Sequence, residues 1–188
     1  MGIGEISLNG KRRAVFLDRD GVLNRAIIRE GKPYPPQTAA ELEMVAEAPA
    51  CLARLKAAGF LLLVVTNQPD VARGTQTRAT VESINASLGA RLPIDGFYVC
   101  YHDSADLCHC RKPKPGLLTD AAADHAIDLG SSFMIGDRYR DVEAAQAAGC
   151  SSVWIDCGYA ERGPLRPADA RVHSLAEATD WILPAVAG

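Results

Sequence analysis

Six consecutive apolar residues, Phe60 to Val65, limit the folds open to this sequence more than any other feature. The run has no alternation of polar and apolar residues, so a strand built from it carries apolar side chains on both faces. Both faces must then be buried, which is typical of a parallel sheet covered by helices on either side. Parallel neighbours need long crossover connections, so the chain is expected to alternate strands with helices.

Apolar runs and amphipathic stretches do alternate along the chain. We predict strands at residues 14–17, 60–65, 96–100, 132–136 and 152–155, and helices at residues 49–58, 77–91, 115–127, 141–148 and 174–183. The Gly- and Pro-rich segments 31–36 and 159–167 are predicted to be loops. The pattern predicts an α/β fold, a three-layer Rossmann-like sandwich with a central parallel sheet, built as a single domain over residues 1–188.

Charge balance and hydropathy narrow the class of protein. The chain carries a formal net charge of −3, which argues against non-specific binding to nucleic acid or to an anionic membrane. Residues 1–13 lack the apolar core of a signal peptide, and no apolar run is long enough to span a bilayer. We expect a cytoplasmic protein that binds neither nucleic acid nor membranes, and a monomer, with an oligomer left open. Its six cysteines are then expected to be core thiols or metal ligands rather than disulfides.

The first predicted strand ends in two carboxylates two residues apart, Asp18 and Asp20. Extended backbone places both on the same face, while Arg19 between them points away. Gly21 follows and lets the chain turn with its backbone N–H groups free to face a ligand. Two adjacent negative charges are costly without a cation near them, and oxygen-only ligands favour Mg²⁺. A polar turn after a strand is the structural alternative.

Other polar residues follow the ends of later strands. Thr66 follows the second strand and Asp137 the fourth, and in a parallel sheet these strand ends meet at one edge, where ligands bind. Cations lie a few residues beyond the predicted strands, namely Arg73, Arg111, Lys112 and Arg138. In a net-acidic protein they indicate a phosphate site, with solvated loop charges as the alternative. Phosphoryl transfer needs positioning and charge stabilisation, which Thr66 and Lys112 would supply by holding phosphoryl oxygens.

Cysteine and histidine gather between the third strand and the Arg111–Lys112 pair. Cys100, His102, Cys108 and Cys110 fall within eleven residues, a set that suits a closed tetrahedral zinc site of structural type. His109 is an alternative to His102 as the fourth ligand. Zinc would fold the loop 100–110, which is too small for a core of its own, and would fix Arg111 and Lys112 against the phosphate.

Four segments together resemble the motifs of the haloacid-dehalogenase-like phosphatase superfamily. They are Asp18-Arg19-Asp20-Gly21, the apolar strand ending in Thr66-Asn67, Lys112-Pro113, and Gly136-Asp137 with Asp141. The resemblance spans about residues 15–155. It implies that Asp18 is a nucleophile forming an aspartyl-phosphate and that Asp20 is the general acid and base. It also implies that Mg²⁺ is held by the Asp18 carboxylate, the Asp20 main-chain carbonyl and Asp137, with Asp141 binding a metal-bound water.

The cysteine-rich loop and its neighbours are similar to one branch of that superfamily, the heptose-bisphosphate and histidinol-phosphate phosphatases. This resemblance implies substrate contacts by Asn67, Gln68, Arg73, Arg111 and Arg138. Two segments depart from the branch. Residues 25–34 replace the usual Asp-x-Gly-Tyr, and residues 69–71 read Pro-Asp-Val where Ser-Gly-Ile is usual. Both segments would border the leaving group.

The spacing of the motifs leaves no room for a separate cap domain, so the site is expected to be open and shaped by loops. The sequence thus predicts a Mg²⁺-dependent sugar-phosphate phosphatase with structural Zn²⁺, acting on a small phosphorylated substrate. Heptose 1,7-bisphosphate, losing its 7-phosphate, is the leading substrate. The alternatives are a histidinol-phosphate phosphatase and, outside enzymes, a phospho-accepting or interaction module that retains the fold.

Overall fold

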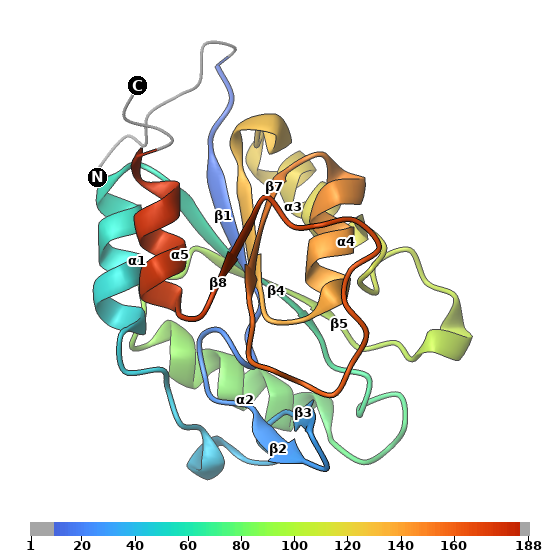
Figure 1. Cartoon of the computed structure of the whole chain (residues 1–188). Helices are drawn as coiled ribbons and strands as arrows, with labels where there is room; N and C mark the ends of the chain where they lie inside the picture. Colours follow the sequence, from blue (N-terminus) through green and yellow to red (C-terminus); the bar gives the residue numbers. More distant parts are fainter. Residues whose placement is uncertain (1–9, 185–188) are drawn as a thin grey trace.

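A six-stranded parallel sheet forms the centre of the chain in the computed structural model, which describes residues 10–184 (Figure 1). Its spatial order is β5-β4-β1-β6-β7-β8. The strands are β1 (Ala14–Leu17), β4 (Leu61–Asn67), β5 (Gly96–Cys100), β6 (Phe133–Gly136), β7 (Ser151–Ile155) and β8 (Ala170–Val172). The predicted parallel sheet is confirmed, and the chain adds β8 to the five strands that the sequence pattern indicated.

Helices cover both faces of the sheet, as Figure 1 shows for the pair α1 and α5 and for the pair α3 and α4. The helices are α1 (Ala48–Ala57), α2 (Arg78–Gly89), α3 (Gly116–His125), α4 (Tyr139–Ala148) and α5 (Leu175–Ile182), with short 3₁₀ turns η1 (Ala39–Glu41), η2 (Ser104–Asp106) and η3 (Leu129–Ser131). The three-layer α/β fold is therefore confirmed.

Alternate residues of β1 point into the two hydrophobic cores that hold these layers together. Val15 and Leu17 pack with residues of α1, α2 and α5, whereas Ala14 and Phe16 pack with residues of α3 and α4. All four are completely buried. A strand with two buried faces explains why the sequence shows continuous apolar runs rather than alternation.

The order of the strands determines where along the sheet a ligand can bind. β1 pairs with β4 on one side and with β6 on the other, so Leu17 lies beside both Val64 and Ile135. The chain leaves β1 towards β4 and β5 and later returns to β6 on the opposite side. Such a reversal opens a crevice at the carboxyl ends of the strands, where ligands bind in open α/β sheets.

Residues 27–34 form a β-hairpin, which overlaps the loop predicted at residues 31–36. β2 (Ile27–Arg29) and β3 (Lys32–Tyr34) pair in antiparallel fashion. Glu30 and Gly31 both have positive φ, 51° and 72°, which matches the tight two-residue turn favoured in hairpins. Proline and glycine made this segment look irregular, but they suit a turn and the edge of a two-stranded ribbon.

Helix boundaries follow local capping. The hydroxyl of Thr77 accepts a hydrogen bond from the Thr80 N–H and starts α2, and Ser174 does the same for α5 through Glu177. Helix α4 begins at Tyr139, two residues before the predicted start, because the Asp141 carboxylate accepts a hydrogen bond from the Arg138 N–H and so closes the first turn.

No segment of residues 10–184 forms a separate cap domain between the strands, as expected. Within the same range no helix is long and apolar enough to cross a membrane. Residues 1–9, part of the segment considered above as a signal peptide, and residues 185–188 lie outside the described residues.

Candidate active site and thiol–imidazole cluster

Three buried carboxylates from separate elements meet at the crevice. Asp18 follows β1, Asp137 follows β6, and Asp141 lies in the first turn of α4. One oxygen atom of each lies within 4.8 Å of the others. We call Asp18, Asp137 and Asp141 the carboxylate cluster. Asp141 is therefore in direct reach of the position expected for the metal ion.

The carboxylate of Asp20 lies outside this cluster and turns to other partners. Its predicted metal contact concerned the main-chain carbonyl oxygen rather than the side chain, and it stays a prediction. The shared side-chain oxygens of the cluster come instead from Asp18, Asp137 and Asp141. The sequence predicted that Asp141 contacts a metal-bound water. In the structure its carboxylate lies within 4.8 Å of the carboxylates of Asp18 and Asp137, the two predicted side-chain ligands.

Burial and mutual repulsion make the negative charge of the cluster costly. Burial raises the pKa of Asp18 to about 6, against the opposing effect of Lys112 and with added repulsion from Asp141 and Asp20. Burial, together with Asp18 and Asp141, raises the pKa of Asp137 well above its usual value. A divalent cation among these oxygens would remove the cost, because it favours the ionised form of every carboxylate.

The surroundings of Asp137 fit a magnesium ion. Its Oδ1 atom is buried and has no hydrogen-bond partner among the described residues, while Oδ2 accepts a hydrogen bond from the Tyr159 hydroxyl at 2.8 Å. Gly21, at φ +92°, passes so close that a Cβ there would lie 1.8 Å from Oδ2. An orphaned carboxylate oxygen within an all-oxygen donor set is what a hard cation requires.

Lys112 supplies the positive charge beside the cluster. Its ammonium group lies 3.0 Å from Asp18 Oδ1 and 2.6 Å from Asp141 Oδ1, and it donates to the Val65 carbonyl at 2.8 Å. These contacts use all three ammonium protons. Burial lowers the pKa of Lys112, but Asp141 and Asp18 outweigh it, so the net pKa lies above its usual value and the side chain is charged.

Asn67 fixes the backbone that carries this lysine. Its side-chain oxygen accepts a hydrogen bond from the Lys112 N–H at 3.1 Å, and its amide donates to the Lys112 carbonyl at 3.0 Å. The end of β4 is thereby joined to the segment after the cysteine-rich loop. Asn67 also lines the pocket, where the sequence expected it to meet substrate.

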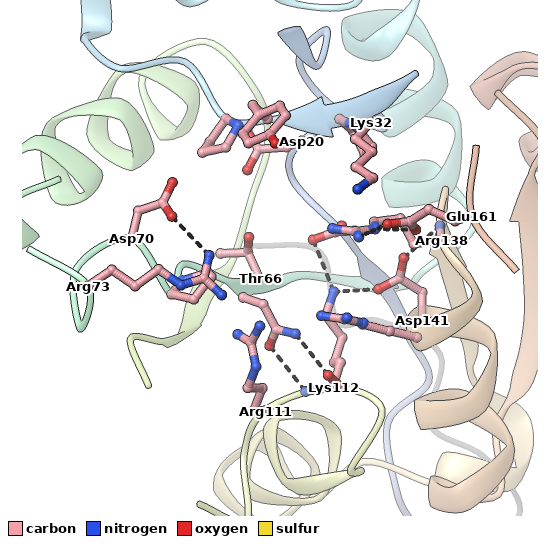
Figure 2. A pocket seen from close by; sticks show the side chains of 17 residues that line it. Asp20, Lys32, Thr66, Asp70, Arg73, Arg111, Lys112, Arg138, Asp141 and Glu161 are labelled. Carbon is pink, nitrogen blue, oxygen red and sulfur yellow. Dashed lines mark hydrogen bonds and ion pairs between the residues drawn. The ribbon is translucent and has the colours of Figure 1, made fainter. Parts of the chain in front are cut away.

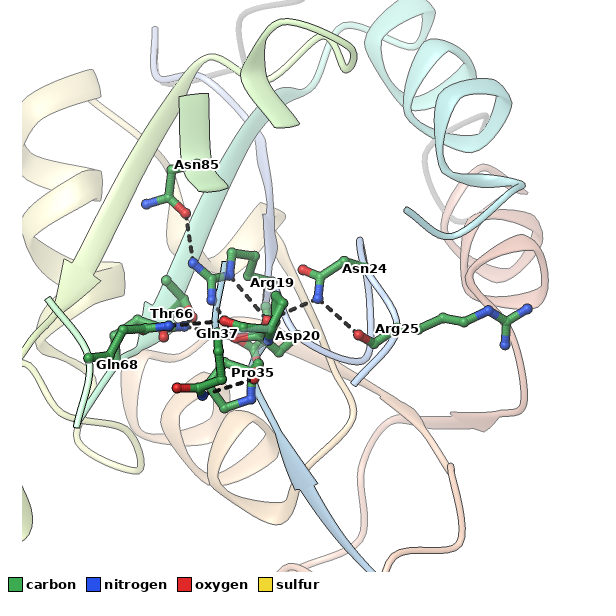
Figure 3. A network of polar contacts seen from close by, with 12 residues as sticks. Arg19, Asp20, Asn24, Arg25, Pro35, Gln37, Thr66, Gln68 and Asn85 are labelled. Atoms are coloured by element: carbon green, nitrogen blue, oxygen red, sulfur yellow. Dashed lines mark hydrogen bonds and ion pairs between the residues drawn. The ribbon is translucent and has the colours of Figure 1, made fainter. Parts of the chain in front are cut away.

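A buried network holds the carboxylate of Asp20 (Figure 3). Arg19 donates to both of its oxygens, at 3.2 Å from Nε and 3.0 Å from a terminal nitrogen, and Asn24 donates to Oδ1 at 3.0 Å. Arg19 has no exposed surface and also donates to Asn85 of α2 at 3.0 Å. Arg19 therefore lies on the α2 side of the sheet, and its guanidinium fixes the direction of the Asp20 carboxylate.

Gln68 completes this network from β4. Its amide donates to Asp20 Oδ2 at 2.8 Å and to the hydroxyl oxygen of Thr66 at 2.9 Å. Because Thr66 accepts through its oxygen, its hydroxyl proton stays available for a ligand. Gln68 is 1% exposed and does not line the pocket, so its expected contact with substrate does not match its place in the structure. It orients two residues that do line the pocket.

The crevice in front of the cluster is a pocket of about 390 Å³ (Figure 2). The β2–β3 hairpin, the end of β4, the segment before α3 and the start of α4 surround it. Its charged lining residues are Asp18, Asp20, Lys32, Asp70, Arg73, Arg111, Lys112, Arg138, Arg140, Asp141 and Glu161. The structure thus gathers all the predicted catalytic residues, Asp18, Asp20, Thr66 and Lys112, around one cavity.

Two of the predicted cations are held by acidic partners. Arg73 donates to both oxygens of Asp103, at 2.9 and 2.8 Å, and this contact lowers the pKa of Asp103 to about 2. Arg138 forms a two-pronged ion pair with Glu161, one bond of which measures 2.9 Å. Both arginines still line the pocket, but much of their charge is compensated before any ligand binds.

Sequence reasoning missed two charged residues that line the pocket, Arg140 and Glu161, and it expected Arg19 to point away from Asp20, whose carboxylate Arg19 in fact holds. The position of Arg140, one residue before Asp141, carried a signal, because the first turn of a helix that follows a strand end points towards the ligand crevice. Glu161 lies in a segment predicted to be a loop, and only the folded chain shows that it reaches the pocket. Lys32 and Asp70 lie in the two segments that were expected to border the leaving group, and both line the pocket.

The cysteine-rich loop folds into a second compact cluster. Cys100, His102, Cys108 and Cys110 each offer an atom within 4.8 Å of the others, and we call them the thiol–imidazole cluster. Its S···S distances are 3.8 and 3.5 Å, and the His102 Nδ1 atom lies 3.7 and 3.4 Å from two sulfurs. Zinc–sulfur bonds of about 2.3 Å in a tetrahedron give an edge of about 3.8 Å, so these atoms fit a zinc ion.

His102, rather than His109, belongs to this cluster. His109 lies on the surface, and its Nε2 atom contacts the Asp120 carboxylate at 2.8 Å. The carbonyl of His102 accepts a hydrogen bond from Arg111 at 3.1 Å. His102 of the thiol–imidazole cluster therefore contacts Arg111, one of the cations that line the pocket.

The chain has the fold, the carboxylate cluster and the adjacent buried lysine of one class of hydrolases. Comparisons with known proteins agree with this class. A family model described as HAD-hydrolase-like matches residues 109–178. A crystal structure of D,D-heptose 1,7-bisphosphate phosphatase from B. bronchiseptica, complexed with magnesium and phosphate, superposes with a TM-score of 0.79. The two chains are 28% identical, and the match covers 92% of this chain and 99% of the other.

Curated relatives narrow the class to one family. The D-glycero-β-D-manno-heptose-1,7-bisphosphate 7-phosphatase of Salmonella typhi is 34% identical over 187 residues, covering 93% of this chain and 91% of the relative. The protein of the same name from Photorhabdus laumondii is 40% identical over 147 residues, covering 72% of this chain and 75% of the relative. This chain belongs to the D-glycero-D-manno-heptose-1,7-bisphosphate 7-phosphatase family of HAD-like hydrolases.

Proposed function

We propose that the chain removes the 7-phosphate from D-glycero-β-D-manno-heptose 1,7-bisphosphate by way of an aspartyl-phosphate. The observation that carries the proposal is the contact of Lys112 with both Asp18 and Asp141 at the mouth of the carboxylate cluster. A nucleophile, a fixed cation and an all-oxygen metal site at one strand edge suit phosphoryl transfer. The substrate follows from the family and from the names of the relatives.

In the first step, an oxygen of Asp18 attacks the phosphorus, and the bond from phosphorus to the sugar oxygen breaks. Asp20 gives its proton to the departing oxygen, so the sugar leaves as a neutral alcohol. Lys112 and the free hydroxyl proton of Thr66 stabilise the negative charge on the phosphoryl oxygens. The hydrogen bonds from Arg19 and Gln68 to Asp20 support this proposal, because they fix the carboxylate that must meet the leaving group.

In the second step, Asp20 takes a proton from water, and the water oxygen attacks the phosphorus of the aspartyl-phosphate. The bond between phosphorus and Asp18 breaks, which releases inorganic phosphate and restores both carboxyl groups. Asp20 accepts hydrogen bonds from Arg19, Asn24 and Gln68, and these partners orient it for the proton transfer in both directions.

Asp18, Asp137 and Asp141, with the main-chain carbonyl of Asp20, would hold Mg²⁺. When bound, the ion supplies positive charge that offsets the charge of the nucleophile and the phosphoryl oxygens. The thiol–imidazole cluster would hold a structural Zn²⁺ with no open coordination position. The proposed enzyme acts as a monomer in the cytoplasm, built as a single domain, and binds a small phosphorylated sugar.

The test is a comparison of kcat/KM across a substrate panel. It contains both anomers of heptose 1,7-bisphosphate, histidinol phosphate and hexose phosphates. The β-anomer of the bisphosphate should give the largest value. A larger value for histidinol phosphate would reject the proposed substrate while leaving the chemistry intact, whereas no turnover of any phosphate ester with added Mg²⁺ would reject the enzyme function itself.

A further inference from the structure

One carboxylate oxygen of Asp137 is held by the protein, and the other is left for a ligand. Oδ2 accepts a hydrogen bond from the Tyr159 hydroxyl at 2.8 Å, while the buried Oδ1 atom has no partner among the described residues. A tyrosine hydroxyl keeps its proton at neutral pH and an ionised carboxylate can only accept, so Tyr159 is the donor. Asp137 therefore presents one unpaired oxygen to a cation in the carboxylate cluster.

The packing around Asp137 restricts rotation of this carboxylate. Gly21 lies against Oδ2 so closely that a Cβ there would lie 1.8 Å from that atom and 3.0 Å from the Tyr159 hydroxyl oxygen. On the main chain, the indole N–H of Trp154 donates to the Asp137 carbonyl at 3.1 Å. The backbone and the carboxylate of Asp137 are thus both held, by a residue of β7 and by the loop that follows β7.

The loop that carries Tyr159 is itself attached to two walls of the pocket. The Ala160 N–H donates to the Gly31 carbonyl of the β2–β3 hairpin at 2.9 Å. Glu161 pairs with Arg138 beside the start of α4 (Figure 2). These contacts of the two following residues limit the movement of the Tyr159 hydroxyl away from Asp137. The hydrogen bond is therefore a fixed part of the site.

The other two members of the carboxylate cluster are restrained in a similar way. Asp18 Oδ1 contacts the Lys112 ammonium group at 3.0 Å. Asp141 has both oxygens occupied, Oδ1 by Lys112 at 2.6 Å and Oδ2 by the Arg138 N–H at 3.0 Å. Each carboxylate of the cluster thus has at least one oxygen held by a protein donor. Such carboxylates do not readily offer both oxygens to the same ion.

This restraint distinguishes between two common divalent cations. Mg²⁺ requires near-ideal octahedral geometry with short bonds and usually keeps several waters. Ca²⁺ takes about six to eight oxygens in flexible arrangements and accepts both oxygens of one carboxylate. A site whose carboxylates are limited to one oxygen each favours Mg²⁺, and a carboxylate that could turn would remove part of that preference.

We propose that Tyr159 is a positioning residue that makes the carboxylate cluster selective for Mg²⁺ over Ca²⁺, because its hydrogen bond limits Asp137 to one available oxygen. The inference rests on the magnesium site of the proposed function and extends it to the choice of metal ion. Tyr159 takes no part in the chemical step. Removal of its hydroxyl should therefore change which ion binds more than how fast the magnesium-loaded enzyme turns over.

The test is calorimetric titration of MgCl₂ and of CaCl₂ into substrate-free protein dialysed free of magnesium. Wild type, Tyr159→Phe and Tyr98→Phe are compared. Tyr98→Phe is the matched control, because the Tyr98 hydroxyl also donates to an aspartate at 2.8 Å, but to Asp124 of α3, outside the carboxylate cluster. Circular dichroism establishes that each variant is folded.

For Tyr159→Phe, the ratio of the Kd for Ca²⁺ to the Kd for Mg²⁺ should fall about tenfold, mainly because Mg²⁺ binds more weakly. Tyr98→Phe should keep the wild-type ratio. The rise in melting temperature that each ion gives measures the same preference by a second route. An unchanged ratio in Tyr159→Phe, whether both affinities are kept or both fall equally, would overturn the inference, because a purely structural role would not distinguish the ions.

Turnover separates failure of this inference from failure of the proposed function. At saturating Mg²⁺, Tyr159→Phe should keep kcat within about threefold of wild type, while the Mg²⁺ concentration for half-maximal activity should rise about tenfold. The expected change of ratio in a protein that hydrolyses no phosphate ester would support the inference and reject the proposed function. Normal turnover with an unchanged ratio would do the reverse. Wild type that binds neither ion would overturn the inference and the magnesium site together.

Discussion

The two clusters suited to metal ions are built in opposite ways. The carboxylate cluster draws Asp18, Asp137 and Asp141 from distant segments, and all three side chains are buried. The thiol–imidazole cluster takes its four members from the eleven residues 100–110, and His102 is exposed. The first exists only when β1, β6 and α4 have assembled, whereas the second needs little more than one loop.

This difference in construction indicates that the two clusters have different functions. A site assembled from the ends of packed strands is rigid, and rigidity is what a nucleophile and its counter-charge require. A loop tied by four local ligands is a means of shaping a wall without a core of its own. The carboxylate cluster should therefore govern the chemical step, and the thiol–imidazole cluster should govern the placement of substrate through Arg111.

The largest effect should come from Asp18→Asn. The amide cannot attack phosphorus, so we expect kcat to fall by about 10⁴-fold or more, as is common when a nucleophile is removed. The substitution also removes one repelling charge from the cluster, so the melting temperature should not fall. The measurement is steady-state turnover alongside thermal melting. Retention of more than about a tenth of the activity would exclude Asp18 as nucleophile.

The pH dependence of stability tests the charge of the same cluster in magnesium-free protein. The pKa of Asp18 is raised from 3.8 to about 6 by burial and by the neighbouring carboxylates, despite Lys112. Between these values the folded protein binds more protons than the unfolded chain, so stability falls as pH rises through this window. The loss attributable to Asp18 is on the order of 3 kcal/mol.

The measurement is the melting temperature of protein dialysed free of magnesium, at steps between about pH 4 and pH 7. Asp18→Asn is the matched control and should show a shallower fall across the window. Added Mg²⁺ should restore stability at the upper end. A wild-type melting temperature that rises through the window, with no difference from the variant, would contradict the assigned environment of Asp18.

Arg19→Met tests whether the buried network of Figure 3 orients Asp20. The variant keeps the volume of a long side chain but removes the hydrogen bonds to both Asp20 oxygens. We expect kcat to fall by about 10²-fold, because a misdirected acid and base slows both steps. Asn85→Ala, which removes the other partner of Arg19, should give a smaller loss in the same direction.

A purely structural role for Arg19 would lower stability without changing the pH profile of kcat. The two readouts therefore distinguish orientation of Asp20 from support of the fold. An Arg19→Met protein with a wild-type kcat and profile would show that Gln68 and Asn24 are sufficient to hold the carboxylate.

The smallest effect should come from the loop. Cys110→Ser should lose about one zinc ion per chain and lower kcat/KM by about tenfold, because Arg111 loses the fixed carbonyl of His102. Metal analysis and kinetics are measured together. His109→Ala is the matched control, since His109 lies in the same loop but outside the cluster, and it should keep both zinc and activity. Wild-type protein without zinc would refute the assignment of the cluster.

Local patterns in the sequence predicted a large part of this molecule. The buried strands β1, β4 and β6 follow from apolar runs, because burial on both faces leaves no alternation. The strands β5 and β7 were also predicted, although several of their residues are partly exposed. The members of the thiol–imidazole cluster could also be predicted, since their spacing sets a local ring of ligands that needs no long-range packing. The choice between His102 and His109 was open, because both are within reach of the same loop.

Other features depended on how distant segments pack. The sequence by itself determined which residue types end the strands β1, β4 and β6, and which cation follows the cysteine-rich loop, and so the chemistry that Asp18, Thr66, Asp137 and Lys112 can offer. Only the tertiary structure decided that Asp141 joins the carboxylate cluster, that Gln68 turns inward, and that Arg140 lines the pocket. The reason is physical: periodicity fixes the face on which a side chain lies, whereas the order of the strands fixes which faces meet.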